Sequence, residues 1–129
     1  MLGEYLDMRA GRVYFAFDRA QNVTETKIDL EQPLLWALDF NVDPMCSVVA
    51  QIEGGEVAVL DEIVLSRAST YDACEEFTRR FPAHESGWVV YAAATGARLR
   101  TSGTSDVAIM RKGLWGGPHA HGRFPRPRV

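Results

Sequence analysis

Residues 36–44, WALDFNVDP, are the stretch from which the fold of this chain is best inferred. The apolar run 34–38 leads directly into Asp39, and Pro44 closes the segment. A continuous apolar run that ends near a proline is typical of a strand buried on both faces. A carboxylate on such a strand is costly unless it is paired or binds a metal ion. Asp39 is therefore either a satisfied structural group or a metal ligand.

The length and composition are those of one globular domain. The chain has 129 residues, of which 47% are hydrophobic and 10% aromatic, so it can bury a substantial core. No apolar run is long enough to span a membrane, and the polar start is unlike a signal peptide. The two cysteines, Cys46 and Cys74, are too few for a disulfide framework, and we expect reduced thiols in a cytoplasmic protein.

Charge is unevenly distributed along the chain. The formal net charge is −3, yet the residues from Arg98 onward contain seven basic side chains and one acid, Asp106. An acidic body with a basic C-terminal third suits a protein whose polyanion contacts lie apart from an acidic metal site. It suits a solvated surface with a basic tail equally well. Charge alone does not favour nucleic-acid binding.

The sequence divides into a lead-in segment (1–30), a core (31–115) and an irregular tail rich in Gly, Pro and Arg (116–129). In the lead-in, residues 12–18 (RVYFAFD) alternate in hydrophobicity and predict an edge strand. In the core, residues 46–52 and 57–65 predict two further strands. The residues between them, Glu-Gly-Gly-Glu, predict a hairpin turn, because glycine adopts positive φ at little cost.

Residues 69–81 give the clearest helix prediction. Ser69 and Asp72 have the spacing of a capping box at its start. Four side chains share one apolar face: Tyr71, Cys74, Phe77 and Phe81. Ion pairs at a spacing of four residues are expected on the opposite face: Glu75 with Arg79, and Glu76 with Arg80.

A further strand is predicted at residues 87–94, and a second helix from Thr104 or Ser105 onward. A strand that follows a crossover helix most simply lies parallel beside the first strand. The predicted fold is therefore α/β, with a mixed sheet and a helix on its face.

Five blocks of sequence, in this order, resemble the nuclease domain of the large terminase subunit of tailed bacteriophages. They are GRVYFAFDR, LDFNVDPM, VLDEIVLSRASTYDACEEF, VVYAAATG and RTSGTSDVAIMRKGL. The resemblance covers roughly residues 3–114. The resemblance implies an RNase H-like mixed β-sheet with flanking helices. It also implies a metal-dependent DNA endonuclease, active with Mg²⁺ or Mn²⁺, that cuts viral DNA during genome packaging.

The same resemblance implies the surroundings in which such a domain works. Its partners would be double-stranded DNA, the terminase small subunit and the portal, in the cytoplasm of a bacterial host cell and with no membrane. The chain has no GxxxxGK[ST] phosphate-binding motif, so the motor ATPase of a terminase is not expected within it.

Two-metal cleavage requires hard oxygen ligands from separate strands that converge on one point. By resemblance, Asp39 is the first metal ligand of the family. The second belongs to a block of Tyr, Gly, Asp, a small residue, Thr or Ser, and Gly, which here reads YAAATG, so that Ala93 occupies the Asp position. The third is expected in a C-terminal segment beyond this sequence. We therefore expect a truncated domain, impaired because Ala93 replaces a metal-binding Asp.

Other carboxylates are weaker candidates for metal ligands. Asp61 and Glu62 end an apolar strand, where one of them must face inward, and a structural role is the alternative. Asp43 could also contribute an oxygen. Asp106 fits the first turn of a helix, where the dipole favours an anion. His119 and His121 form a spaced pair without an acidic or cysteine partner nearby in the sequence.

Three residues are candidate contacts to the DNA backbone: Arg98, Arg100 and Ser102, which follow Thr95 and Gly96. A solvated loop is the alternative for this segment. For the whole chain, the alternatives are a non-catalytic DNA- or portal-binding module with the same fold, another RNase H-like nuclease such as a junction resolvase, or a structural remnant without activity.

Overall fold

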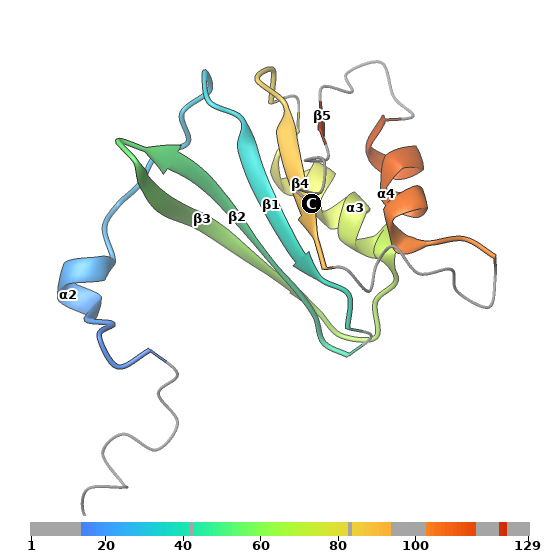
Figure 1. Cartoon of the computed structure of the whole chain (residues 1–129), viewed down its shortest axis with the longest axis horizontal. Coiled ribbons are helices and arrows are strands. Elements are labelled where there is room, and N and C mark those ends of the chain that lie inside the picture. Colours follow the sequence, from blue (N-terminus) through green and yellow to red (C-terminus); the bar gives the residue numbers. More distant parts are fainter. Residues whose placement is uncertain (1–13, 42, 83, 94–102, 116–121, 124–129) are drawn as a thin grey trace, which may run out of the picture.

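The structure is a computed structural model that describes residues 14–41, 43–82, 84–93, 103–115 and 122–123. Its helices and strands are, in chain order, α2 (Arg19–Asn22), β1 (Leu34–Asp39), β2 (Met45–Glu53), β3 (Glu56–Leu65), α3 (Thr70–Arg80), β4 (Trp88–Ala92), α4 (Asp106–Trp115) and β5 (Gly122–Arg123). Figure 1 shows the strands as one twisted sheet, with α3 and α4 together at one side.

The strands form one mixed sheet in the order β3-β2-β1-β4-β5. β1 and β3 both lie antiparallel to β2, whereas β4 lies parallel to β1, and β5 parallel to β4. The chain reaches β4 from β3 through the crossover helix α3, as a parallel neighbour of β1 requires. This mixed α/β arrangement is consistent with the RNase H-like fold, and the predicted fold class is confirmed.

The core lies between one face of the sheet and α3. The rings of Trp36 on β1 and Phe77 on α3 stack with centroids 4.2 Å apart and planes 12° apart. The indole N–H of Trp36 donates a hydrogen bond of 2.9 Å to the hydroxyl of Ser47, so this buried donor is satisfied. α4 packs against α3 and adds Met110 and Leu114 to the same core.

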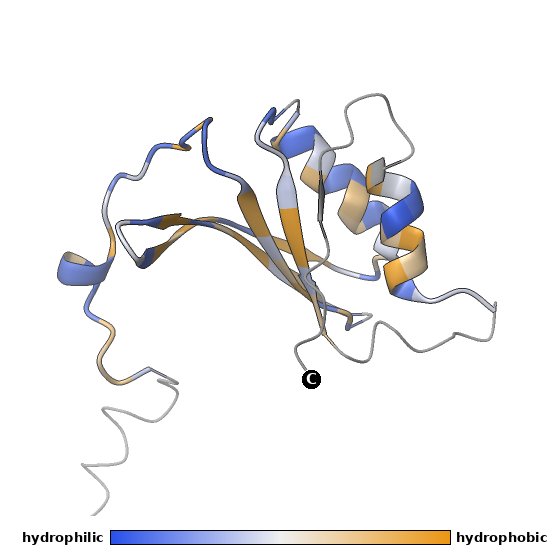
Figure 2. Cartoon of the chain, turned by 45° about the horizontal axis from the view of Figure 1, so that its top comes forward, coloured by the Kyte–Doolittle hydropathy of each residue, from blue (hydrophilic) through white to orange (hydrophobic). Residues whose placement is uncertain are grey.

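β1 is buried on one face, and the prediction of burial on both faces is wrong. Leu34, Trp36 and Leu38 point toward α3 and are buried, whereas Leu35 and Ala37 on the other face are only partly covered. α3 and α4 lie on the same side of the sheet, so neither of them covers that second face (Figure 2).

The predicted helix over residues 69–81 is confirmed as α3. Ser69 is its N-cap and forms the predicted capping box with Asp72. The predicted apolar face is wrong at Tyr71, which is 53% exposed. Cys74, Phe77 and Phe81 are buried as predicted, and Thr70 and Ala73 are buried as well.

The ion pairs between residues of α3 share a single carboxylate, that of Glu76. Glu76 accepts from Arg80, as predicted, and also from Arg79, three residues along the helix. The predicted pair of Glu75 with Arg79 is wrong, because Arg79 donates from both Nε and Nη2 to Glu76 instead. Hydrogen bonds from Arg79 and Arg80 lower the pKa of Glu76 to about 2.

α3 and α4 are joined by a buried polar contact. The hydroxyl of Thr70 donates to the carboxylate of Asp106, and both side chains are buried. Asp106 does lie in the first turn of α4, as predicted, but it also links the two helices. The link leaves this carboxylate buried.

A buried amide on β2 holds the segment that leads into β1. The side chain of Gln51 accepts from the N–H of Asp29 at 3.0 Å and donates to the carbonyls of Asp29 and Gln32 at 2.7 and 2.9 Å. The imidazole Nε2 of His84 contacts the same Gln32 carbonyl at 2.7 Å. These contacts fix the backbone of residues 29–32 against β2 just before β1 begins.

The N-terminal arm, which we define as residues 14–18 (YFAFD), forms no strand. The predicted strand over residues 12–18 is therefore wrong for the arm, while Arg12 and Val13 lie outside the described residues. Asp18 is the N-cap of α2, so the chain enters a helical turn where a strand would have to continue. Tyr14, Phe15 and Phe17 are 78%, 67% and 51% exposed.

Candidate functional site

The candidate site lies on the sheet face that α3 and α4 leave uncovered. Strand register places Ala37, Val48, Glu62 and Tyr91 side by side across β1, β2, β3 and β4. Because side chains alternate along a strand, Asp39 lies on this same face, two residues beyond Ala37. We call it the open face.

Asp39 is the last residue of β1 and is exposed, which corrects the expectation of a buried carboxylate. Its Oδ2 accepts a hydrogen bond of 2.7 Å from the side-chain amide of Asn41. The LDFN motif thus forms a local turn in which Asn41 orients the carboxylate. An exposed, oriented carboxylate at a strand end is well suited to bind a hard cation.

Ala93 follows β4 beside the end of β1. β1 and β4 are parallel, with Leu38 opposite Ala92, and the N–H of Ala93 donates a hydrogen bond of 3.2 Å to the carbonyl of Leu38. Position 93 therefore follows the end of β4 directly next to the end of β1. The methyl group of Ala93 offers no oxygen there.

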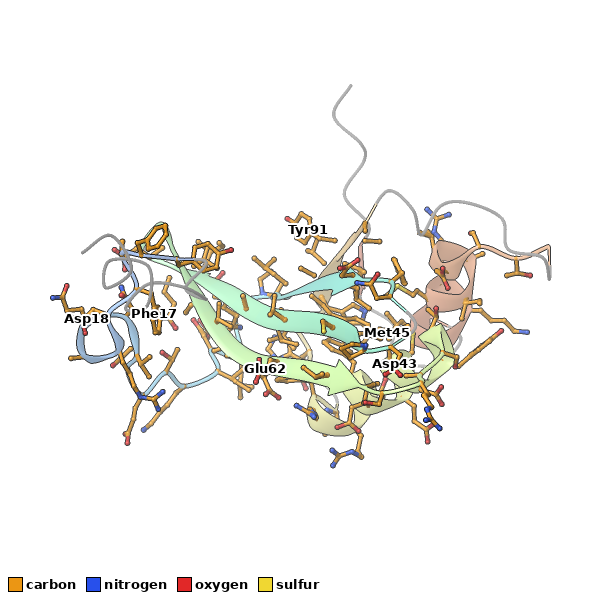
Figure 3. All side chains as sticks on the ribbon, turned by 90° about the horizontal axis from the view of Figure 1, so that it is seen from below. Phe17, Asp18, Asp43, Met45, Glu62 and Tyr91 are labelled. Atoms are coloured by element: carbon orange, nitrogen blue, oxygen red, sulfur yellow. The ribbon has the colours of Figure 1, made fainter. Side chains whose placement is uncertain are left out.

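Glu62 and Asp61 point to opposite faces of the sheet. Glu62 is exposed on the open face, where Figure 3 shows it on β3. Asp61 points toward α3, and its Oδ2 accepts from Arg80 at 3.0 Å. Of the two, Glu62 alone shares a face with Asp39. Asp61 has the structural role that the sequence left open as the alternative.

Asp39 and Glu62 both line a shallow hollow of about 370 Å³ on this side of the sheet. Its remaining lining is mostly apolar or weakly polar: Ala37, Leu38, Cys46, Ser47, Val48 and Val64. Sequence reasoning missed Cys46, Val48 and Val64 as part of the site. The two-residue period of β2 was the signal that could have placed Cys46 and Val48 on one face. It could not have placed Val64, because the register shift opposite Val49 and Ala50 interrupts the period along β3.

The carboxylates of the open face are few. Within the residues that the structure describes, no group of three or more His, Cys, Asp or Glu side chains is placed to hold a metal ion. Asp43 is used by the backbone, since its Oδ1 accepts from the N–H of Arg67 at 3.3 Å. Asp39 and Glu62 are thus the two acidic groups of the hollow itself.

The other predicted site residues lie outside the described residues. These are Arg98, Arg100 and Ser102 with the preceding Thr95 and Gly96, and the pair His119 and His121. Their roles stay predictions. Among the helices of the described ranges, none is both long and apolar enough to cross a membrane.

No protein-family model matches the chain, and no curated protein matches it.

Proposed function

We propose that this chain is an RNase H-like nuclease domain of the terminase type whose two-metal centre is incomplete. What supports the proposal is the position of residue 93: the hydrogen bond from its N–H to the carbonyl of Leu38 places it beside Asp39 at the ends of two parallel strands. An Asp at position 93 would supply a second carboxylate at the point where the sequence blocks of the family require one.

The small number of carboxylate ligands explains why nuclease activity is expected to be impaired. Mg²⁺ keeps several waters and is usually anchored by one or two carboxylates, and two such ions need more anchors than one exposed Asp39 provides. Glu62 is the other carboxylate of the hollow. These residues do not fit a complete two-metal centre of Mg²⁺ or Mn²⁺, so no catalytic step is assigned to them.

The partners follow from the same proposal. Double-stranded DNA would approach the open face near Asp39, with Arg98, Arg100 and Ser102 contacting its phosphates. The terminase small subunit and the portal would be the protein partners of the longer assembly. A cytoplasmic location in a bacterial host cell belongs to the proposal as well.

The test restores the missing carboxylate. Ala93→Asp is expected to bind Mn²⁺ in calorimetric titration and to nick plasmid DNA with Mn²⁺, while the unmodified chain does neither. Ala93→Asp combined with Asp39→Asn should lose both gains. Ala92→Asp is the matched control, because it adds the same charge one residue earlier, where a strand side chain points to the other face.

Two results would contradict parts of this proposal. Cleavage by the unmodified chain that disappears with Asp39→Asn would show that its metal centre is complete without residue 93. DNA binding by all variants without Mn²⁺ binding by any of them would instead favour a non-catalytic DNA-binding module. Melting curves with and without Mn²⁺ separate loss of folding from loss of metal binding.

A further inference from the structure

The outer edge of β3 is a strand edge without a neighbour in the described part of the chain. β3 is the last strand of the sheet and pairs with β2 alone. Arg80 covers part of this edge, since its Nη1 donates 2.8 Å to the carbonyl of Glu62 and also contacts Asp61. The segment 56–60 lies ahead of that covered part. A free edge of this kind is a template for pairing with another strand.

The side chains of this segment favour strand addition. Val57 and Val59 are 63% and 62% exposed and are separated by one residue, so both lie on one face of the sheet. The segment, EVAVL, contains no lysine and no proline, which natural edges often use to prevent pairing. A register shift against Val49 and Ala50 marks where the regular edge ends.

The N-terminal arm matches this edge in length and pattern. Like segment 56–60 it has five residues, and Phe15 and Phe17 have the same spacing as Val57 and Val59. Figure 3 shows Phe17 and Asp18 at the end of the molecule away from α4. Both surfaces are exposed within a single copy. An aromatic side chain opposite a β-branched one is a favourable cross-strand pair.

Charges beside the two surfaces favour the pairing at Arg19 and oppose it at Asp18. Arg19 follows the arm directly, and the hairpin that begins β3 carries Glu53 and Glu56. Arg19, Glu53 and Glu56 are exposed, and none of these three forms an ion pair within the described ranges. If the arm runs antiparallel to β3 with Phe17 opposite Val57, Arg19 lies next to the hairpin.

We propose that the arm of one copy of this chain adds as an antiparallel strand to the β3 edge of a second copy, so that two copies exchange arms. A two-fold symmetric exchange covers both exposed surfaces on both copies. Main-chain hydrogen bonds give the affinity, and the Phe–Val pairs set the register. The proposal does not depend on the metal centre, and Asp39 and Ala93 lie elsewhere on the sheet.

Sedimentation velocity over a series of concentrations tests the exchange on the full chain. The unmodified chain is expected to show a concentration-dependent dimer. The edge variant Val57→Lys with Val59→Lys, and the arm variant Phe15→Ser with Phe17→Ser, are each expected to be monomeric. Tyr71→Ser is the matched control, because Tyr71 is comparably exposed but lies on α3, and it should leave the dimer intact.

A mixture of the edge and arm variants gives the sharpest readout. The edge variant keeps an intact arm, and the arm variant keeps an intact β3 edge. The mixture should therefore form a heterodimer in which one arm pairs with one edge. Asp18→Asn should strengthen the dimer, because it removes the like charge opposite Glu56 and keeps a helix-capping residue. A monomeric unmodified chain, a dimer that survives in both variants, or a mixture that stays monomeric would each overturn the proposal.

One further outcome would show that the β3 edge is paired within a single copy. If the unmodified chain is monomeric and the amides of residues 57 and 59 are nevertheless protected from hydrogen exchange at every dilution, the arm occupies the edge of its own copy. That result also overturns the exchange.

Discussion

At the scale of single residues, Gln51 illustrates how much one buried polar side chain can organise. It is fully buried, and its three hydrogen bonds satisfy the N–H and carbonyl of Asp29 and the carbonyl of Gln32. A backbone segment without strand neighbours is thereby paired through a side chain. The amide is suited to this because it donates and accepts at once.

We expect Gln51→Met to lower the free energy of unfolding by about 1–3 kcal/mol, because it keeps the volume but leaves backbone groups unpaired. Urea unfolding monitored by circular dichroism measures the change. Gln32→Ala is the control: it removes an exposed side chain and keeps the carbonyl that Gln51 contacts. Equal stability of the Gln51 variant and the unmodified chain would show that water replaces these bonds without loss.

The lowered pKa of Glu76 predicts how the free energy of unfolding depends on pH. Hydrogen bonds from Arg79 and Arg80 lower the pKa of Glu76 from 4.5 to about 2, so the folded state favours the ionised form. Its contribution is fully present above about pH 4.5 and is lost as pH falls through about 2. In Glu76→Gln that contribution is absent, so the stability difference from the unmodified chain should shrink over this range.

Denaturant unfolding at several pH values between 7 and 2 measures that difference. Glu75→Gln is the control, since Glu75 is one residue away and has no ion pair among the described residues. A stability difference for Glu76→Gln that stays constant down to pH 2 would contradict the prediction.

The position of Asp39 was predicted from the sequence, but its environment was not. The apolar run 34–38 correctly indicated a central strand. The assignment of Ala93 to a ligand position stays a prediction. Burial of the carboxylate was inferred from the length of the run alone, which does not tell whether a helix covers one face or two. Asp39 is exposed because α3 covers only the opposite face.

At the scale of elements, the sequence correctly predicted those features that are determined by a few neighbouring residues. The capping box of α3 and the Gly-Gly hairpin, with φ of 57° and 88° at Gly54 and Gly55, are of this kind. The arm was mispredicted because alternation shows which side chains could share a face, whereas a strand also needs a neighbour to pair with. Its own N-cap, Asp18, competes with strand formation.

The contact between α3 and α4 offers a stabilising substitution. Gly113 lies in α4, and a Cβ added there would be 3.5 Å from Cβ and 3.6 Å from Sγ of Cys74, which is ordinary van der Waals contact. We expect Gly113→Ala to raise the free energy of unfolding by about 1 kcal/mol through helix propensity.

The opposite sign is expected for Gly54→Ala, because φ of 57° in the hairpin is unfavourable for a residue with a Cβ. Thermal unfolding of both variants beside the unmodified chain checks the two signs together. A lowered melting temperature for Gly113→Ala would show that α4 lies closer to α3 than these distances state.

At the scale of the whole molecule, the two thiols differ in burial and should therefore differ in their rates of alkylation. Cys74 is buried in the core, and burial raises the pKa of its thiol to about 12, so little thiolate forms near neutral pH. Cys46 is half-buried beside the hollow of the open face. Native-state alkylation should therefore modify Cys46 first, and Cys74 at a rate limited by opening of the core.

Mass spectrometry after timed exposure to iodoacetamide at pH 8 separates the two sites. Cys74→Ala verifies the assignment of the slow site. Low concentrations of urea should accelerate modification of Cys74 far more than that of Cys46. Similar rates for both thiols in native buffer would show that the contact between α3 and the sheet opens easily.

The mixed topology itself was predictable because each step needed only neighbouring elements: a hairpin, a crossover helix and a parallel return. The pairing of helices was not, since Thr70 and Asp106 are 36 residues apart and their buried contact has no local pattern. Long-range polar links of this kind follow from packing rather than from any window of sequence.

The central place of β1 has a consequence for how the chain is made. Its antiparallel neighbour β2 follows within a few residues, but its parallel neighbour begins only at Trp88. Until that residue has left the ribosome, β1 has an unpaired edge and its tryptophan lacks part of its cover. A nascent chain that pauses between α3 and β4 therefore exposes an apolar strand edge, and it is there that aggregation or chaperone capture should begin.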